Sequence, residues 1–192
     1  NQMGEFGEVF DSNYDYNGPP TKLPAGRVEV KLTGGRKLEA FELNLASAEG
    51  IAKLTGGGEV RAMVDAGHIQ TPVSLVRIPG EVGEVKLLSP ESVKLLGYAP
   101  PEKHEEEGLK CFEQKAAEGF SYAVCAGWKK AGDETLLALT VSTNREGGNA
   151  REVAEKRVKV ALARGYDEFL TKHREWWTAF WNKSDVSFPE PH

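Results

Sequence analysis

The chain has 192 residues and a formal net charge of −5, with 28% charged and 40% hydrophobic residues, proportions typical of a globular domain. Its lysines and arginines form no basic stripe, which excludes nucleic acid and an anionic membrane as main partners. No run of about 18 apolar residues and no signal-peptide pattern occur, which excludes a membrane-spanning helix and leaves the compartment open. Because the chain begins at Asn1, we expect a processed product or a piece of a longer protein.

Residues 1–24 are rich in Gly, Asn, Asp, Tyr and Pro and show no sustained period, so they predict an irregular arm. Two interpretations of this arm are open. The first, which we favour, is a strap whose tyrosines pack on the neighbouring domain. The second is a loop that presents aromatic and carboxylate groups to a sugar. Under the second interpretation, the substrate-contact candidates are Asp11, Asn13, Tyr14, Asp15 and Tyr16.

Residues 25–146 contain short apolar segments separated by Gly- and Pro-containing turns, a pattern typical of an antiparallel β-sandwich. In the first segment Val28, Val30 and Leu32 alternate with charged residues, which predicts a half-buried strand. About ten strands are expected from the spacing. They lie at 27–32, 41–45, 51–54, 60–64, 73–78, 82–88, 92–97, 109–116, 120–129 and 135–143.

Residues 100–108 (PPEKHEEEG) predict a solvated loop between two of these strands. His104 and the three glutamates after it resemble a metal cluster in composition only, because consecutive residues cannot all reach one ion. We therefore predict no metal site.

Cys111 and Cys125 are too few for a disulfide framework or a zinc site. They flank a predicted hairpin that turns near residues 117–119, so they face each other across it. Two buried thiols and one cross-strand disulfide both fit this arrangement. We favour the thiols, because the geometry that a disulfide requires is restrictive.

Residues 147–192 predict two helices. Asn149 and Glu152 form a variant of the capping box that begins a helix ending at Arg164, and Gly165 separates it from a second helix at 166–181. Asp167 is expected to cap the second helix. One face of this second helix is strongly aromatic and consists of Phe169, Leu170, His173, Trp176, Trp177, Phe180 and Trp181.

No motif predicts catalysis. The sequence distinguishes no pair of carboxylates for glycoside hydrolysis, contains no G-x-S-x-G elbow, and has no phosphate-binding glycine loop, so we assign neither a catalytic residue nor a cofactor. His173 is interpreted as a packed core residue. The tryptophans on the aromatic face suit either a sugar ring or another protein surface, and we favour a protein surface.

Several segments resemble a known family. LPAGRVEV (23–30), FELNLASA (41–48) and VRAMVDAGH (60–68) resemble the N-terminal β-domain of glycoside hydrolases of family 95, the α-L-fucosidase-like enzymes, and of the related family 65. HREWWTAFW (173–181) is similar to the helical linker that leads from that domain into an (α/α)6 catalytic barrel. The chain departs from the family pattern because it lacks the strands that precede this point in family members.

The resemblance implies a mainly β fold, a β-supersandwich followed by two C-terminal linker helices, and a periplasmic or secreted protein that takes part in polysaccharide breakdown. It places the catalytic carboxylates in a barrel that comes after this chain, so we expect a non-catalytic domain that packs against that barrel. An autonomous carbohydrate-binding module and a scaffold domain are the alternatives. The domain-interface candidates are Phe169, His173, Trp176, Trp177, Phe180 and Trp181.

Overall fold

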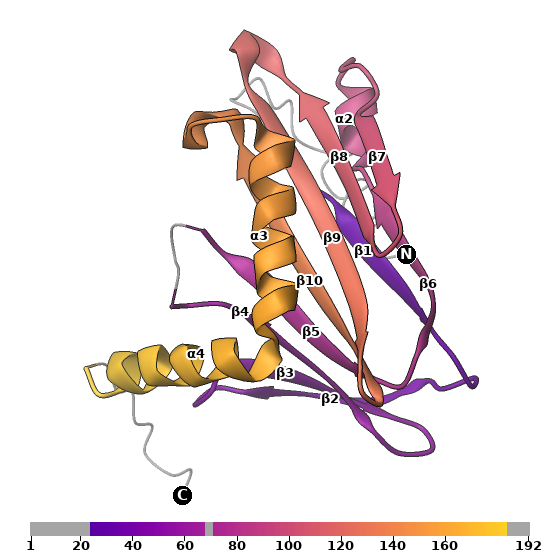
Figure 1. Ribbon diagram of the computed structural model, residues 1–192, viewed down its shortest axis with the longest axis vertical. Helices are drawn as coiled ribbons and strands as arrows, with labels where there is room; N and C mark the ends of the chain where they lie inside the picture. Colours follow the sequence, from indigo (N-terminus) through magenta and orange to yellow (C-terminus); the bar gives the residue numbers. More distant parts are fainter. Residues whose placement is uncertain (1–23, 68–70, 184–192) are drawn as a thin grey trace, which may run out of the picture.

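The computed structural model describes residues 24–67 and 71–183 (Figure 1). The arm candidates Asp11, Asn13, Tyr14, Asp15 and Tyr16 lie outside these residues. The strands are β1 (Arg27–Leu32), β2 (Leu38–Asn44), β3 (Glu49–Leu54), β4 (Glu59–Val64), β5 (Val73–Pro79), β6 (Val82–Leu88), β7 (Glu102–Glu106), β8 (Leu109–Lys115), β9 (Ser121–Ala131) and β10 (Glu134–Thr143). The helices are α2 (Glu91–Leu95), α3 (Ala150–Arg164) and α4 (Tyr166–Trp181), and short 3₁₀ turns lie at Ala117–Gly119 and Asn144–Glu146.

The strands form two antiparallel sheets. The larger sheet has eight strands in the order β2-β3-β4-β5-β10-β9-β8-β7, and β1 pairs with β6 in a second sheet. Helix α3 lies along β9 and β10 on one face of the larger sheet, and β1 and β6 lie behind it (Figure 1). The predicted fold class, mainly antiparallel β followed by two C-terminal helices, is confirmed.

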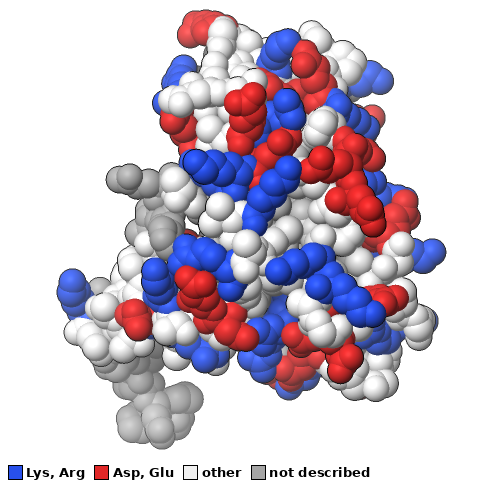
Figure 2. Space-filling view, viewed as in Figure 1, with Lys and Arg blue, Asp and Glu red and all other residues white. Residues whose placement is uncertain are grey.

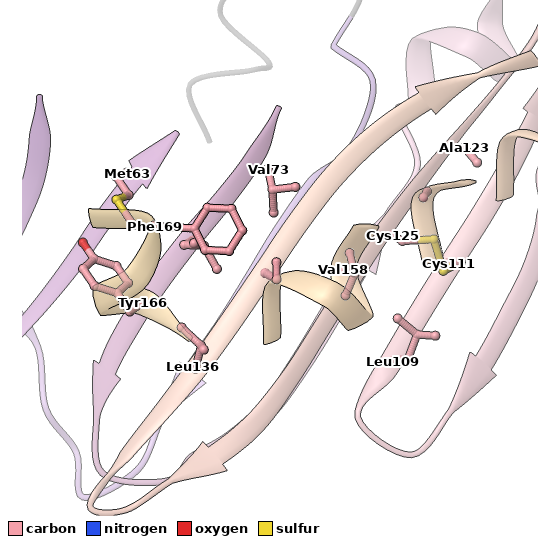
Figure 3. Packing of buried hydrophobic residues seen from close by; sticks show 14 of the residues in the cluster. Met63, Val73, Leu109, Cys111, Ala123, Cys125, Leu136, Val158, Tyr166 and Phe169 are labelled. Atoms are coloured by element: carbon pink, nitrogen blue, oxygen red, sulfur yellow. A yellow bond between two sulfur atoms is a disulfide. The ribbon is translucent and has the colours of Figure 1, made fainter. Parts of the chain in front are cut away.

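The main core lies between α3 and the larger sheet (Figure 3). Helix α3 contributes one apolar face to this core, because Ala150, Ala154, Val158 and Ala161 are buried. Gly127 on β9 permits the close approach of the helix, since a Cβ atom there would lie 2.4 Å from Val158 Cγ1.

The second sheet has an apolar and a charged face. Val28, Val30 and Leu32 are partly buried, whereas the intervening residues are exposed, as the alternation predicted. The exposed face carries opposite charges on neighbouring strands, because Glu29 is paired with Lys86 and Lys31 with Glu84. This face is therefore suited to contact with water.

Two predicted elements are wrong. Residues 92–97 were predicted to form a strand, but most of this segment belongs to helix α2. Pro90 is the N-cap of the helix, Glu91 lies in its first turn, and Gly97 follows its end with φ 81°. The segment predicted as a loop at 100–108 contains β7, which among the described strands lies at an edge of the larger sheet beside β8. Its charged side chains fit a strand because an edge strand leaves them in water.

The ends of the two C-terminal helices were only partly predicted. The side-chain oxygen of Asn149 accepts a hydrogen bond from the Glu152 N–H at 3.1 Å, so the predicted cap of α3 is confirmed. The predicted cap of α4 is wrong, because its N-cap is Gly165 and Asp167 lies in the first turn, where it pairs with Arg77. Gly165 has φ 85° and ψ 167°, a conformation open to glycine but outside the left-handed helical region.

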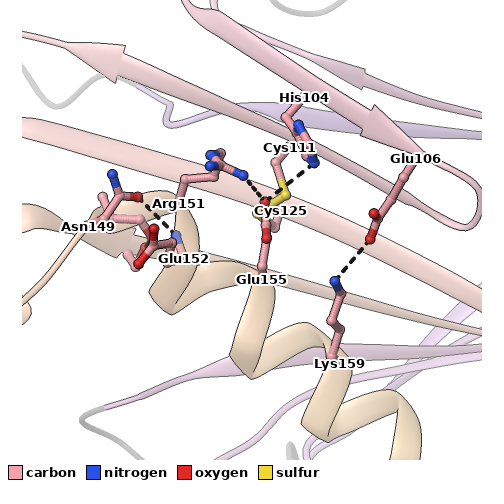
Figure 4. The surroundings of a disulfide bond; sticks show 11 residues. His104, Glu106, Cys111, Cys125, Asn149, Arg151, Glu152, Glu155 and Lys159 are labelled. Carbon is pink, nitrogen blue, oxygen red and sulfur yellow. Dashed lines mark hydrogen bonds and ion pairs between the residues drawn. A yellow bond between two sulfur atoms is a disulfide. The ribbon is translucent and has the colours of Figure 1, made fainter.

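Cys111 and Cys125 form a disulfide beneath α3 (Figure 4). The prediction of free thiols is therefore wrong, and the alternative holds. The reason is the register: the two residues are direct partners on β8 and β9, with their Cα atoms 4.2 Å apart. Antiparallel pairing produces such close spacing at its non-hydrogen-bonded positions, which the residue types alone do not reveal.

Acidic and basic side chains are interspersed over the face of the molecule that carries α3 (Figure 2). Lys159 pairs with Glu106 of β7, and Arg151 pairs with Glu155 one turn along the helix. Such exposed pairs add little stability and form no single-sign patch that would attract a polyanion.

Candidate docking surface on the last helix

The first half of α4 is packed onto the larger sheet. Tyr166, Phe169 and His173 are buried, and Tyr166 and Phe169 belong to the core cluster with Met63 and Val73 (Figure 3). These three helix positions are spaced by three and four residues, so they share one face. The N-terminal half of the aromatic face therefore contributes to the core of this chain.

A buried carboxylate at the start of β3 holds α4 in place. Glu49 is only 1% exposed. Its Oε2 atom lies 2.7 Å from Arg174 Nη2, and its Oε1 atom accepts a hydrogen bond from the Tyr166 hydroxyl at 3.3 Å. Arg61 of β4 adds a weaker contact at 3.9 Å. Glu49 thus connects β3 to the beginning of α4 through Tyr166 and to its middle through Arg174.

The ionisation of this cluster depends on its surroundings. Burial by itself raises the pKa of Glu49. The hydrogen bond and charge of Arg174, together with the charge of Arg61, lower this pKa by more than burial raises it, so the net pKa lies below the usual value. Burial, followed by the charge of Glu49, raises the pKa of the Tyr166 hydroxyl well above its usual range. At neutral pH the cluster therefore contains an ionised carboxylate and a neutral phenol.

Two further contacts fix the beginning and middle of α4. The guanidinium of Arg77 lies 4.5 Å from the centre of the Tyr166 ring and forms ion pairs with Asp167 and Glu134. The His173 Nδ1 atom accepts a hydrogen bond from the Ala66 N–H at 3.3 Å. His173 is thus a packed, hydrogen-bonded core residue, as the sequence predicted.

We expect Glu49→Gln to lower the free energy of unfolding by about 1–3 kcal/mol at pH 7, because it removes the charge that Arg174 and Arg61 face. The folded pKa of Glu49 is depressed, so its contribution is present above the unfolded pKa and is lost as pH falls through the folded pKa. Urea unfolding between pH 7 and pH 3 should therefore show the difference between wild type and variant shrinking towards acid.

Glu84→Gln is the matched control for this measurement. Glu84 forms an ion pair with Lys86 at 3.5 Å on the exposed face of β6, where both side chains are half in water. The same change of charge should have little effect there. Equal stability of Glu49→Gln and wild type at pH 7 would show that the buried cluster does not hold α4.

The second half of α4 carries an aromatic cluster, which we call the aromatic end: Trp176, Trp177, Phe180 and Trp181. The rings of Trp176 and Phe180 are stacked with centroids 5.5 Å apart, and Phe180 meets Trp181 edge to face at 5.0 Å. Phe180 is 38% exposed and Trp181 40% exposed. The Trp181 indole N–H donates to the Leu45 carbonyl at 2.9 Å, which fixes its orientation.

The structure thus divides the six domain-interface candidates into two groups. Phe169 and His173 face the sheet of this chain, whereas the aromatic end continues beyond them and exposes Phe180 and Trp181. Glu49 was missed in the sequence, where nothing distinguishes it from other glutamates. Only the pairing of β3 with β4 and the packing of α4 reveal that it is buried.

Within residues 24–67 and 71–183, no three His, Cys, Asp or Glu side chains are grouped to hold an ion. None of the helices in the same residues is long and apolar enough to cross a membrane. The aromatic end, with Phe180 and Trp181 exposed, is the candidate site that the sequence also indicated.

Comparison with known proteins supports the fold. No family model and no curated protein matches the sequence. Among solved structures, the chain is similar to the one described as "Putative kojibiose phosphorylase from human microbiome", with 12% sequence identity and a TM-score of 0.52. The match covers 81% of this chain and 24% of that chain, in its N-terminal part, so the chain spans about a quarter of that structure.

Proposed function

We propose that the chain is a non-catalytic β-domain of a larger glycoside hydrolase of the α-L-fucosidase-like class or a related phosphorylase. In this proposal the aromatic end docks on a helical catalytic domain located later in the same polypeptide, and the arm of residues 1–24 helps to shape the entrance of that domain. The observation that carries the proposal is the exposure of Phe180 and Trp181 on a helix whose beginning is held firmly by Glu49.

The chemistry of the aromatic end suits a protein partner. Three indoles and a phenyl ring form one cluster, and the exposed rings of Phe180 and Trp181 bury further apolar area once a second surface covers them. A helix with a fixed start presents this area in one orientation. The likeness to part of a longer carbohydrate-active enzyme supports a domain as the partner.

The disulfide supports the expected location. Disulfides persist in oxidising compartments and are rare in the cytosol, so the Cys111–Cys125 bond favours a periplasmic or secreted protein. The five candidates in the N-terminal arm are still predicted to contact the substrate: Asp11, Asn13, Tyr14, Asp15 and Tyr16.

The second candidate function is an autonomous carbohydrate-binding module. It is favoured by the same exposed rings, because the apolar C–H face of a sugar stacks on an indole. The two functions differ in what the chain binds by itself.

Calorimetric titration of this chain with a panel of plant and host oligosaccharides separates the two functions. We expect no heat of binding, because the aromatic end is assigned to a protein surface. Heat that disappears in the Phe180→Ala/Trp181→Ala variant, which leaves the buried half of α4 unchanged, would contradict the proposal and establish the sugar-binding module. Thr171→Ala, on the exposed side of the helix, is the control variant.

A further inference from the structure

Two buried nitrogen atoms on α4 have no hydrogen-bond partner within residues 24–67 and 71–183. The first is Nε2 of His173, a residue that is only 1% exposed. The second is the indole nitrogen of Trp177, one helical turn further along. The two rings meet edge to face, with their centroids 6.2 Å apart. Because buried polar groups in native proteins are nearly always hydrogen-bonded, this pair indicates a bound molecule.

Both nitrogen atoms are hydrogen-bond donors. The Nδ1 atom of His173 accepts from the Ala66 N–H at 3.3 Å, which assigns the proton of the neutral imidazole to Nε2. An indole nitrogen can only donate. The two side chains therefore cannot satisfy each other. A metal cation does not fit either, because neither nitrogen presents a lone pair to it.

The charges beside α4 favour a neutral acceptor. Arg174 and Arg61 both face the Glu49 carboxylate, with nitrogen-to-oxygen distances of 2.7 Å and 3.9 Å. An anion bound to His173 and Trp177 would compete with Glu49 for these cations and would lose its own hydration, which is costly in a buried position. A neutral molecule requires only hydrogen bonds.

The turn after β2 runs alongside α4. The Leu45 carbonyl, at the start of this turn, accepts from the Trp181 indole. The Glu49 carboxylate, just after the turn, contacts Arg174. Ser47 lies midway between these two contacts, so it lies next to the middle of the stretch of helix that they span.

The Ser47 hydroxyl is a third group available to a bound molecule. Its oxygen is buried and forms no hydrogen bond within the part of the chain that the structure describes. It is close enough to Glu49 to lower the pKa of that carboxyl, after the larger effects of burial and Arg174. A hydroxyl accepts as well as donates, so Ser47 can accept from a molecule to which His173 and Trp177 donate.

We propose that one buried water molecule binds between α4 and the turn after β2, accepting from His173 Nε2 and Trp177 Nε1 and donating to Ser47 Oγ. Water is the smallest molecule that can do both, which suits a closely packed seam. About three hydrogen bonds are usual for an internal water, and globular proteins hold roughly one such water per 27 residues. The water fixes the orientation of Trp177 as the Leu45 carbonyl fixes that of Trp181. This site is independent of any domain that docks on the aromatic end.

Nuclear magnetic resonance of the ¹⁵N-labelled chain tests the site, with solvent water as the probe. A long-lived internal water gives cross-peaks of opposite sign in NOESY and ROESY spectra. We expect such water peaks at the indole N–H of Trp177. The indole N–H of Trp181 is the internal control and should give none, because it donates to the Leu45 carbonyl and its ring is 40% exposed.

His173→Asn removes the donor and keeps the acceptor, since the side-chain oxygen of asparagine can replace Nδ1 opposite the Ala66 N–H. The water loses one of its partners, so the Trp177 water peaks should weaken at least roughly fivefold. Thr178→Asn, at an exposed position on the same helix, is the matched control and should leave these peaks unchanged.

Three results would overturn the proposal: no water peak at Trp177 in the wild type, water peaks of equal strength at Trp177 and Trp181, or Trp177 peaks that His173→Asn leaves unchanged. If His173→Asn does not fold, the comparison of the two indoles in the wild type decides the question.

Discussion

Replacing both Cys111 and Cys125 with alanine is expected to lower the free energy of unfolding by about 3 kcal/mol. The bond closes a loop between residues 14 apart, and its loss restores the conformational freedom of that loop in the unfolded chain. Both sulfur atoms are buried under α3, so the variant also loses packing at this position. Guanidinium unfolding of the purified chain measures the difference.

A reductant separates the bond from the packing. Dithiothreitol should lower the stability of the wild type towards that of the double alanine variant and leave the variant unchanged. If the reductant has no effect on either protein while free-thiol titration shows two reduced cysteines in the wild type, then the two residues do not form a stabilising bond.

Gly127→Ala is expected to destabilise the chain by about 1–3 kcal/mol, since the added Cβ would lie 2.4 Å from Val158 Cγ1 and 3.1 Å from Leu162 Cδ1. The helix and sheet must separate locally to accept the methyl group. For a chain of this size, each kcal/mol corresponds to about 2–4 °C in Tm. Thermal unfolding followed by circular dichroism is the measurement.

A double-mutant cycle identifies the clash as the cause. In a Val158→Ala background, the helix has lost the methyl groups that obstruct the new Cβ, so Gly127→Ala should cost much less there. Gly148→Ala is the control, because its Cβ would make an ordinary 3.6 Å contact with Val153. Equal costs of Gly127→Ala in both backgrounds would contradict the close packing of α3 on β9.

Features set by local sequence could be predicted. The span of α4 matches the predicted 166–181, because its apolar residues follow the helical period. The span of β6 matches the predicted 82–88, because Gly80 and Pro90 interrupt the chain on either side. The Asn149 cap is equally local. In contrast, α2 is short and was predicted as a strand. Its capping residues indicate a helix, but its valine and leucines are also typical of a strand.

Features set by distant pairing could not be predicted. The strand order places β10 between β5 and β9, so the edge positions of β2 and β7 depend on contacts far apart in the chain. Phe41 and Leu43 are exposed, although their alternation resembles that of the half-buried β1, because the face of the sheet that they share with Val64 of β4 is open at this end. The disulfide depends in the same way on the register of β8 with β9.

The candidate site shows the same division. The aromatic face of α4 was evident from helical spacing, but its separation into a buried half and the exposed aromatic end depends on where the sheet ends beneath the helix. Glu49 carries no local signal, since its partners Arg174 and Tyr166 lie more than 100 residues away in sequence.

Hydrogen exchange at the aromatic end tests the proposed docking most directly. The measurement compares amides of residues 174–183 in this chain with the same amides in a polypeptide that also contains the catalytic domain proposed to follow it. We predict at least roughly tenfold slower exchange in the longer protein, because a docked partner suppresses opening of the last turns of α4. The Phe180→Ala/Trp181→Ala variant should cancel this protection, whereas identical exchange in the two wild-type proteins would contradict the account.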